Sequence, residues 1–215
     1  MDSVLDNLDV YVDGFTTTVS LTLVAAVGAL ILGTLIAAMR VSPVPPLRGA
    51  GSLYVTLVRN TPLTVVFFLV FFGLPEVDIT FSFFTFAVVA LSLYTAAFVA
   101  EAVRAGINSV QAGQAEACRS VGMTFGQTLR LVVLPQAFAN SIPPLASVFI
   151  ALLKNTSIAS AFFVADALQR TQGLINSNAQ AVLWILAGTA IGYLILALGA
   201  SLLFSLLERS VKVAR

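Results

Sequence analysis

The sequence predicts an all-α integral membrane protein with five transmembrane helices. Three observations lead to this fold class: the scarcity of charge, the length of the apolar segments and the one-sided distribution of basic residues. Of 215 residues, 59% are hydrophobic and only 10% are charged, whereas soluble domains carry about 25% charged residues. Water is therefore not the solvent for most of the surface, and the lipid bilayer is an expected partner.

The composition also argues against several kinds of chemistry. The formal net charge is +1, and the chain has no His and a single Cys. Such a small charge gives no electrostatic footprint for nucleic acid, and the residues that usually hold zinc are missing. We therefore expect no nucleic-acid partner, no metal site and no catalytic residue. The sequence also contains no G-x-x-x-x-G-K-[ST] loop to cradle the phosphates of a nucleotide.

The apolar segments predict a single transmembrane domain that covers residues 1–215. A spanning helix needs about 20 apolar residues, because each residue adds 1.5 Å across a hydrocarbon core of about 30 Å. The predicted spans cover approximately residues 15–39, 52–74, 81–103, 142–165 and 179–207. The first span is uncharged and follows acidic residues, so it does not have the pattern of a cleavable signal.

The second and fourth spans have less obvious starting points. Thr61–Leu74 is strongly apolar but short, so we expect its helix to begin near Ser52 and to hold Arg59 at the water boundary. Pro143 and Pro144 are expected to open the fourth span, since the first turn of a helix does not need their missing N–H groups.

The basic residues predict the orientation of the chain. Nine of the eleven Lys and Arg residues follow the first, third or fifth span. Because basic residues favour the cytoplasmic side of a membrane, we expect the N-terminus outside and the C-terminus in the cytoplasm. The turn with Glu76 and Asp78, and also Asp166, would then lie outside. The long loop of residues 107–136 would lie in the cytoplasm.

This long loop is polar and rich in helix formers. Gly122 is placed to end a helix over Gln114–Val121, because glycine adopts the left-handed conformation without strain. Thr124 and Gln127 read as a T-x-x-Q capping box that opens a second short helix, which Pro135 is expected to stop. So short a pair of helices buries little surface alone, and it must pack against a partner protein or lie on the membrane.

Five residues of the loop follow the spacing E-A-A, three residues, G, nine residues, I-x-L-P. They are Glu116, Ala117, Gly122, Leu134 and Pro135, with Cys118 in place of the second Ala and Val132 in place of the Ile. This pattern resembles the cytoplasmic EAA loop of ATP-binding-cassette (ABC) importer permeases, the segment that docks into a separate ATPase subunit.

Further segments resemble the polar amino-acid branch of these permeases, which includes the histidine, glutamate and glutamine types. They are Arg59-Asn60-Thr61-Pro62-Leu63, Tyr94–Gly106, Leu134-Pro135-Gln136-Ala137 and Lys154-Asn155-Thr156-Ser157. The likeness covers essentially the whole chain. Within the branch, the sequence is most similar to the glutamate permease subunits of actinobacteria.

The resemblance implies the type I ABC importer permease fold and a multi-pass assembly in the bacterial cell membrane. Two permease subunits, either identical or homologous sisters, would form the path for a polar amino acid such as glutamate. Two ATPase subunits would bind ATP and Mg²⁺ below, and an extracytoplasmic amino-acid-binding protein would deliver the substrate. The chain itself is then not an enzyme. Glu116 and Ala117 would press into the ATPase, Gly122 would make the corner, and Pro135 would fix the return to the fourth span.

Lys154 supports a second hypothesis. Counted from Ile142, it lies about 18 Å into the membrane at 1.5 Å per residue, where an ammonium group costs at least about 2.5 to 3.5 kcal/mol. Two interpretations remain open. In one, Lys154 lines the substrate pathway and meets the carboxylate of a passing amino acid, helped by Asn155, Thr156 and Ser157. In the other, it bonds to carbonyl groups or to an acid on the sister subunit.

The alternative class is a subunit of an ion-coupled secondary transporter or channel. Such a protein would usually carry more intramembrane acids or an internal repeat, and the 215 residues show no repeat. It would also have no reason for a long EAA-type loop. Glu101 is expected near the cytoplasm, too far from Lys154 to be its partner, with Arg104 at i+3 as its companion.

Overall fold

Helices make up the protein. The computed structural model describes the backbone of residues 2–212 and the side chains of residues 4–211. Within these residues there is no strand, and four helical segments are long and apolar enough to cross a membrane: Leu8–Val41, Phe83–Asn108, Phe125–Phe162 and Ala179–Val211. A bent pair, Pro45–Arg59 with Leu63–Val77, is a candidate for a fifth. The predicted all-α membrane fold is confirmed.

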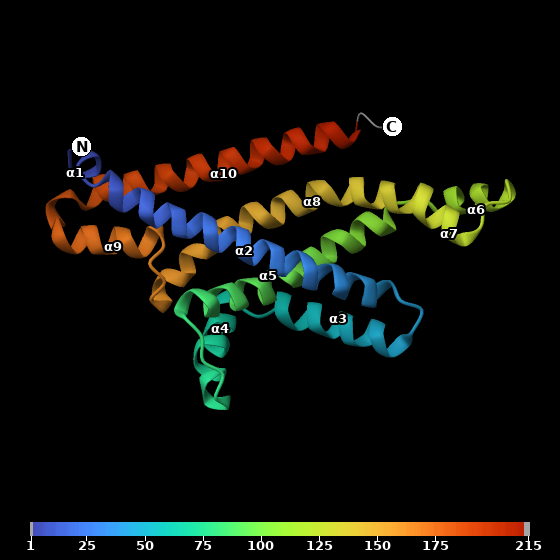
Figure 1. Cartoon of the computed structure of the whole chain (residues 1–215), viewed down its shortest axis with the longest axis horizontal. Coiled ribbons are helices and arrows are strands. Elements are labelled where there is room, and N and C mark those ends of the chain that lie inside the picture. Colours follow the sequence, from blue (N-terminus) through green and yellow to red (C-terminus); the bar gives the residue numbers. More distant parts are fainter. Residues whose placement is uncertain (1, 213–215) are drawn as a thin grey trace.

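The elements follow one another in a simple order. They are α1 (Asp2–Leu5), α2 (Leu8–Val41), α3 (Pro45–Arg59), α4 (Leu63–Phe68), the π-helical turn η1 (Leu69–Gly73), the 3₁₀ turn η2 (Pro75–Val77), α5 (Phe83–Asn108), α6 (Ala112–Ser120), α7 (Phe125–Thr128), the π-helical turn η3 (Leu129–Val133), α8 (Leu134–Asn155), the 3₁₀ helix η4 (Thr156–Phe162), α9 (Ala167–Ser177), the 3₁₀ turn η5 (Ala179–Ala181) and α10 (Val182–Lys212). Figure 1 shows α2, α5, α8 and α10 running along the long axis, with α6 and α7 projecting at one end and α9 at the other.

Helix α5 is the centre of the bundle, because both α2 and α8 pack extensively against it. The buried positions of α2 recur at intervals of three or four residues, and most of them are small: Gly14, Thr18, Leu21, Ala25, Ala29, Gly33 and Ala37. Small residues let membrane helices approach closely. At Gly33, a Cβ atom would lie only 2.6 Å from the side chain of Val99 on α5. Close approach, rather than large interlocking side chains, therefore holds this helix pair together.

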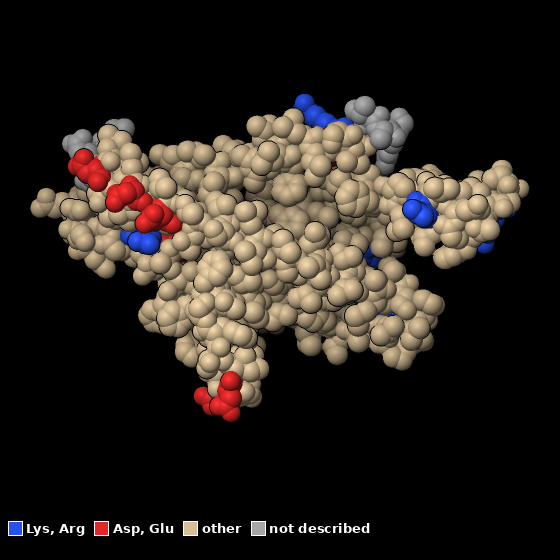
Figure 2. Space-filling view, in the orientation of Figure 1, with Lys and Arg blue, Asp and Glu red and all other residues tan. Residues whose placement is uncertain are grey.

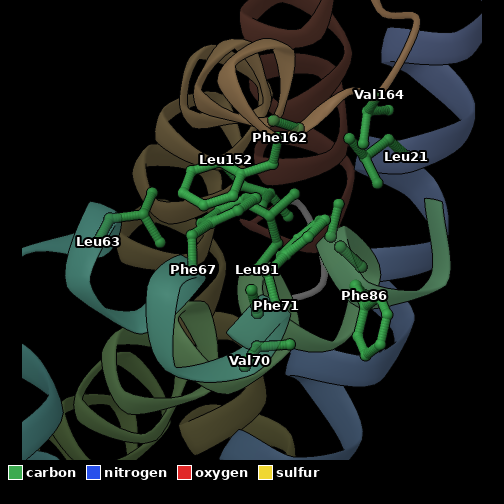
Figure 3. Close-up of a cluster of buried hydrophobic side chains, with 14 residues drawn as sticks. Leu21, Leu63, Phe67, Val70, Phe71, Phe86, Leu91, Leu152, Phe162 and Val164 are labelled. Atoms are coloured by element: carbon green, nitrogen blue, oxygen red, sulfur yellow. The ribbon is translucent and has the colours of Figure 1, made fainter. Parts of the chain in front are cut away.

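A cluster of aromatic rings holds the arm formed by α4 and η1 against the bundle. The rings of Phe67 and Phe71 lie 5.0 and 4.9 Å from the ring of Phe162 on η4, and Phe71 lies 5.2 Å from Phe86 on α5. These distances are those of favourable aromatic pairs. Figure 3 shows these side chains meeting where α4, η1, α5 and η4 converge.

The second predicted span is broken, so the prediction of one helix over residues 52–74 was wrong. Helix α3 ends at Arg59 and α4 begins at Leu63, at an angle of 107°. Pro62 explains the break, because proline has no N–H group and disfavours the helical conformation of the residue before it. At the break, the side-chain amide of Asn60 donates to the carbonyl of Thr56 at 2.7 Å and so closes the last turn of α3.

The helix of the fourth predicted span begins earlier and ends earlier than expected. Helix α8 starts at Leu134 and ends at Asn155, so Pro143 and Pro144 lie inside it and do not open it. Membrane helices tolerate interior prolines where neighbouring groups satisfy the freed carbonyls. Pro135 does not stop the preceding helix either, because the π-helical turn η3 leads directly into α8, whose first turn accepts a proline.

Charged side chains are unevenly distributed over the face seen in Figure 2. Acidic side chains lie at the end that holds α1 and α9 and at the tip of the arm, whereas basic side chains lie mainly towards the end that holds α6 and α7. Arg170 is a basic residue at the acidic end, where it lies 4.0 Å from Asp13. Acidic and basic side chains on this face therefore gather towards opposite ends of the bundle.

Candidate functional site

The projecting loop formed by α6, α7 and η3 contains the corner that the sequence predicts. Gly122 has a φ of +82°, in the left-handed region. Its N–H group donates to the carbonyl of Arg119 at 3.0 Å, and the N–H of Met123 donates to the carbonyl of Cys118 at 3.0 Å. This pair of bonds is the Schellman motif, which ends a helix at a glycine. A Cβ atom at Gly122 would meet no other described atom within 4 Å, so the left-handed backbone conformation, and not a lack of space, requires glycine here.

The predicted capping box is also present. The side-chain oxygen of Gln127 accepts from the backbone N–H of Thr124 at 2.8 Å, and the Thr124 hydroxyl accepts from the N–H of Gln127 at 3.3 Å. Together they satisfy two N–H groups that the start of α7 would otherwise leave free. The end of α6 and the start of α7, which lie on either side of the corner, are thus both fixed by the local sequence.

The two anchor points of the loop were not predicted from the sequence. The Gln136 amide at the start of α8 donates to the side-chain oxygen of Gln114 on α6 at 2.5 Å. The Asn140 amide donates to the Ser109 hydroxyl at 2.8 Å. Because these bonds join residues 22 and 31 positions apart, no local pattern reveals them. The first bond attaches the loop to α8, and the second joins the end of α5 to α8.

The residues predicted to couple to a partner lie on the exposed surface of this loop. Glu116 and Ala117 are exposed on α6, and Leu134 and Pro135 are exposed at the start of α8. Cys118, which takes the place of an Ala, is buried. The structure therefore places these four residues on one projecting unit without forming a chemical site among them.

Sequence reasoning missed the apolar character of the loop's tip. The side chain of Val121, just before the corner, is 75% exposed, and that of Phe125, just after it, is 81% exposed. Leu131 on η3 is also exposed. Large apolar residues gathered at a projecting tip are typical of a surface that binds another protein. The signal was present in the sequence as apolar residues on both sides of Gly122.

Lys154, Asn155, Thr156 and Ser157 span the end of α8 and do not lie on one continuous helix. Thr156 is fully buried, whereas Lys154 is exposed. The Thr156 hydroxyl donates to the carbonyl of Leu153 at 2.7 Å, and the Ser157 hydroxyl donates to the carbonyl of Lys154 at 2.8 Å. Both hydroxyl groups therefore already donate their protons to backbone carbonyls and not to a ligand.

Lys154 itself lies in the last turn of α8, about 30 Å from Leu134 at 1.5 Å per residue. It lies this far along the helix because α8 begins at Leu134, eight residues before Ile142. Among the side chains of residues 4–211, none makes a hydrogen bond or ion pair with its ammonium group. The exposed cation is available to a ligand or to a neighbouring subunit.

The cavity beside the aromatic arm is unsuited to a charged ligand. Its volume is about 290 Å³, and it lies among phenylalanines of α4, η1, α5 and η4, with Thr64 as its one hydroxyl-bearing lining residue. A zwitterionic amino acid needs more polar partners than this, because burying unpaired charge is costly. Over the described part of the chain, no three His, Cys, Asp or Glu side chains gather as a metal site would require.

A bundle of long apolar helices with a capped, projecting helical loop defines a multi-pass membrane protein. The family model described as the binding-protein-dependent transport system inner membrane component matches residues 29–213. The chain belongs to this family.

Its relatives agree with this assignment over nearly their whole length. The chain is 38% identical over 207 residues to the probable glutamine ABC transporter permease protein GlnM of Bacillus subtilis, covering 96% of this chain and 95% of the relative. It is 42% identical over 196 residues to the glutamate transport system permease protein GluC of Corynebacterium glutamicum, covering 86% of each.

Solved structures give the same fold. The crystal structure of an amino acid ABC transporter with histidines superposes with a TM-score of 0.89 at 35% identity, covering 97% of each chain. An inward-facing structure of the MetNI methionine ABC transporter superposes with a TM-score of 0.76 at 20% identity, covering 96% of this chain and 98% of the other. At that identity the second match shows the fold alone. The predicted type I importer permease fold is confirmed.

Proposed function

We propose that the chain is the permease subunit of an ATP-driven importer for glutamate or a related polar amino acid. The observation that carries this proposal is the projecting loop at the basic end of a permease-family body, capped on both sides of its corner and apolar at its tip. Relatives named as glutamate and glutamine permeases support the substrate class.

The loop provides a docking surface for an ATPase subunit. Glu116 and Ala117 present the exposed side of α6, and Val121 and Phe125 present apolar side chains at the corner. Fully burying a Val or Phe side chain contributes about 1.5 to 3 kcal/mol. A cleft in the ATPase that covers these side chains would therefore gain binding energy from the tip, while Glu116 adds a charged contact beside it.

The loop is built to transmit movement. Gln114 and Gln136 attach it to α8, and Ser109 and Asn140 join α8 to the end of α5, so the loop moves with those helices. ATP and Mg²⁺ bind to the partner ATPases, whose closure draws the loops of two permease subunits together. The helices then rock as rigid bodies and open the path to the outside. This chain carries out no chemistry in that cycle.

The translocation path lies between two permease subunits, either two copies of this chain or this chain with a homologous sister. The aromatic cavity within one chain is too apolar for a zwitterion, which favours a path between subunits. Lys154 supplies a positive charge towards the substrate carboxylate at the outer half of α8, with Asn155, Thr156 and Ser157 shaping the same helix end. An extracytoplasmic binding protein delivers the amino acid to this side.

The bundle lies in the bacterial cell membrane with its N-terminus outside and its C-terminus in the cytoplasm. The distribution of acidic and basic side chains seen in Figure 2 supports this orientation. The projecting loop then meets the ATPase in the cytoplasm, and the acids near α1 and α9 face the binding protein.

Co-purification tests the proposed function. A tagged chain should retain an ATPase subunit, and replacing Val121 and Phe125 together with Ser should release it. Phe138→Ser is the matched control, because Phe138 is also well exposed but lies on α8 beyond the tip. Ion-driven amino-acid uptake by the chain alone, with no ATPase retained, would instead support a secondary transporter.

A further inference from the structure

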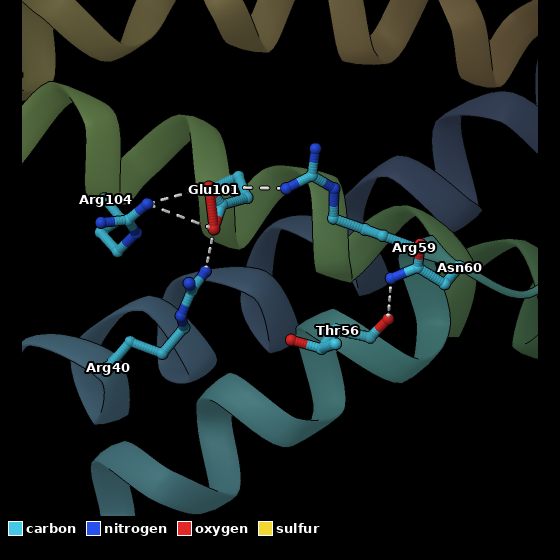
Figure 4. A network of polar contacts seen from close by, with 6 residues as sticks. All are labelled: Arg40, Thr56, Arg59, Asn60, Glu101 and Arg104. Carbon is cyan, nitrogen blue, oxygen red and sulfur yellow. Dashed lines mark hydrogen bonds and ion pairs between the residues drawn. The ribbon is translucent and has the colours of Figure 1, made fainter.

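Glu101 on α5 is the centre of an ion-pair network, of which the local sequence predicts only the pair with Arg104. Arg104 Nη2 lies 3.1 Å from Glu101 Oε2, as the spacing i, i+3 predicts. Arg40 from the end of α2 also pairs with Glu101, and Arg59 from the end of α3 lies 3.6 Å from it. Figure 4 shows the three guanidinium groups approaching the carboxylate from different directions. One carboxylate thus joins three helices.

The carboxylate controls the balance of charge in this cluster. The side chain of Arg40 is only 14% exposed and that of Glu101 25%. Three cations around one anion leave a net positive charge, and its repulsion is opposed by Glu101 and by the solvent that reaches the side chains of Arg59 and Arg104, which are 44% and 35% exposed. Glu101 therefore adds an electrostatic link between the ends of α2, α3 and α5, beside the apolar cluster that also joins them.

Arg59 occupies the mechanically important position. It is the last residue of α3, immediately before the 107° bend that leads to the aromatic arm. Its guanidinium group also lies over the ring of Phe98 on α5, 5.5 Å from the ring centre. Because the chain between Asn60 and Pro62 is not helical, the bend can act as a hinge whose inner end is fixed to α5 by Arg59.

Helix α5 continues from Glu101 towards the projecting loop of α6, α7 and η3, which is called the docking loop from here on. Glu101 lies seven residues before the end of α5 at Asn108, and α6 begins at Ala112. Less than a third of α5 separates Glu101 from the loop, so a displacement of the loop is passed to Glu101 by a short rigid piece of helix. Glu101 in turn contacts Arg59 at the end of α3. The cluster thus lies between the docking loop and the hinge.

We propose that Glu101 and Arg59 form a clamp that passes movement of the docking loop through α5 and α3 to the hinge and the aromatic arm. This proposal rests on the proposed function, because it assumes that the loop is driven by an ATPase. Arg40 extends the clamp to α2, so the inner ends of three helices move as one body. The arm beyond the hinge then changes its angle when the ATPases close.

Arg104 provides a matched control for Arg59. Arg59→Gln and Arg104→Gln each remove one of the positive charges that pair with the Glu101 carboxylate. Arg104, however, belongs to the same helix as Glu101, so its loss cuts no link between helices. The Tyr54 hydroxyl donates to the carbonyl of Leu93 at 2.6 Å, and this bond keeps α3 on α5 in both variants.

The experiment measures amino acid imported per ATP hydrolysed by the full complex, with its ATPase and binding protein, in proteoliposomes. Arg59→Gln should lower this ratio at least about fivefold, the lower end of usual coupling between distant sites. Arg104→Gln should leave the ratio unchanged, and Arg59→Lys should recover most of it because the charge is kept.

Equal ratios for Arg59→Gln and Arg104→Gln would overturn the clamp, as would loss of the assembled complex in Arg59→Gln, which would show a purely structural role. These outcomes are separate from failure of the proposed function. If the unaltered chain retains no ATPase, the importer assignment fails, whereas a working complex indifferent to Arg59 rejects only the clamp.

Discussion

Gly106 of α5 and Ser141 of α8 lie in tight contact between the two helices that carry the docking loop. A Cβ atom on Gly106 would lie 1.9 Å from the Ser141 hydroxyl oxygen and 2.6 Å from the carbonyl oxygen of Ala137. The serine side chain can rotate away, but the backbone carbonyl cannot move without the helix. This contact therefore fixes the spacing of α5 and α8 at the base of the loop.

Gly106→Ala should destabilise the protein, because the added methyl group forces the two helices apart. Overpacking of this kind costs about 1 to 3 kcal/mol. Thermal unfolding in detergent, followed by circular dichroism, measures the change. Gly199→Ala is the control, since a Cβ atom there meets nothing within 4 Å. Equal melting temperatures for the two variants would show that the α5–α8 contact is not as tight as described.

Gly122→Val should reach the membrane in normal amounts yet fail to couple ATP hydrolysis to uptake. Gly122 has a left-handed φ, which costs other L-residues about 1 to 2 kcal/mol and β-branched residues most. Gly122→Asn is the matched variant, because asparagine tolerates this conformation, and it should retain most activity. Transport by Gly122→Val at the native rate would count against the corner.

Asp166 gives the protein a pH dependence at the end of the bundle that holds α9. The residue is fully buried between the η4 and α9 segments, and its Oδ1 accepts from the N–H of Gln169 at 2.9 Å as the N-cap of α9. Its Oδ2 has no hydrogen bond among the described residues. Burial raises the pKa of Asp166 to about 6 from 3.8, although the backbone N–H groups of Gln169 and Leu168 oppose the shift.

A raised pKa in the folded state means that folding favours the protonated carboxyl group. This contribution to stability is complete below about pH 4 and is lost as the pH rises through 6. Asp166→Asn keeps an N-cap acceptor without the charge, so it should be more stable than the native chain at pH 8, and the difference should vanish near pH 4. Melting temperatures across this range test it. A difference independent of pH would show that the carboxylate is not desolvated.

Lys154→Met separates the two interpretations of that residue. If Lys154 meets the substrate carboxylate, the variant should assemble normally and show a raised KM for uptake. If it pairs with an acid of the neighbouring subunit, the complex should dissociate instead. Size-exclusion chromatography and uptake kinetics on the same preparation distinguish these results. A normal KM in an intact complex would remove Lys154 from both roles.

Local patterns predicted the parts of the site that local bonds create. The Gly122 corner and the box formed by Thr124 and Gln127 depend on residues at most five positions apart, and both were confirmed. The bond between Gln114 and Gln136 joins distant segments, so neither partner carries a signal of the other.

The predicted helix boundaries were wrong where the effect of a proline was inferred from its position within an apolar segment. Pro62 breaks a helix that hydropathy alone made continuous, whereas Pro143 and Pro144 lie within a helix they were expected to open. Apolar composition shows that a segment lies in the membrane, but the packing of neighbouring helices decides whether it bends. The Arg59 and Arg40 contacts with Glu101 were missed for the same reason, since only the fold brings three helices together.

The side of the membrane on which Glu116 lies tests the central claim most directly. Cysteine introduced at Glu116, in a chain carrying Cys118→Ala, should react with a membrane-impermeant maleimide in inside-out vesicles and not in intact cells. Binding of the ATPase should then protect it. Cysteine at Glu76, on the tip of the arm, should show the opposite sidedness. Reaction at position 116 in intact cells would place the loop outside, beyond the reach of any ATPase, and would contradict the account.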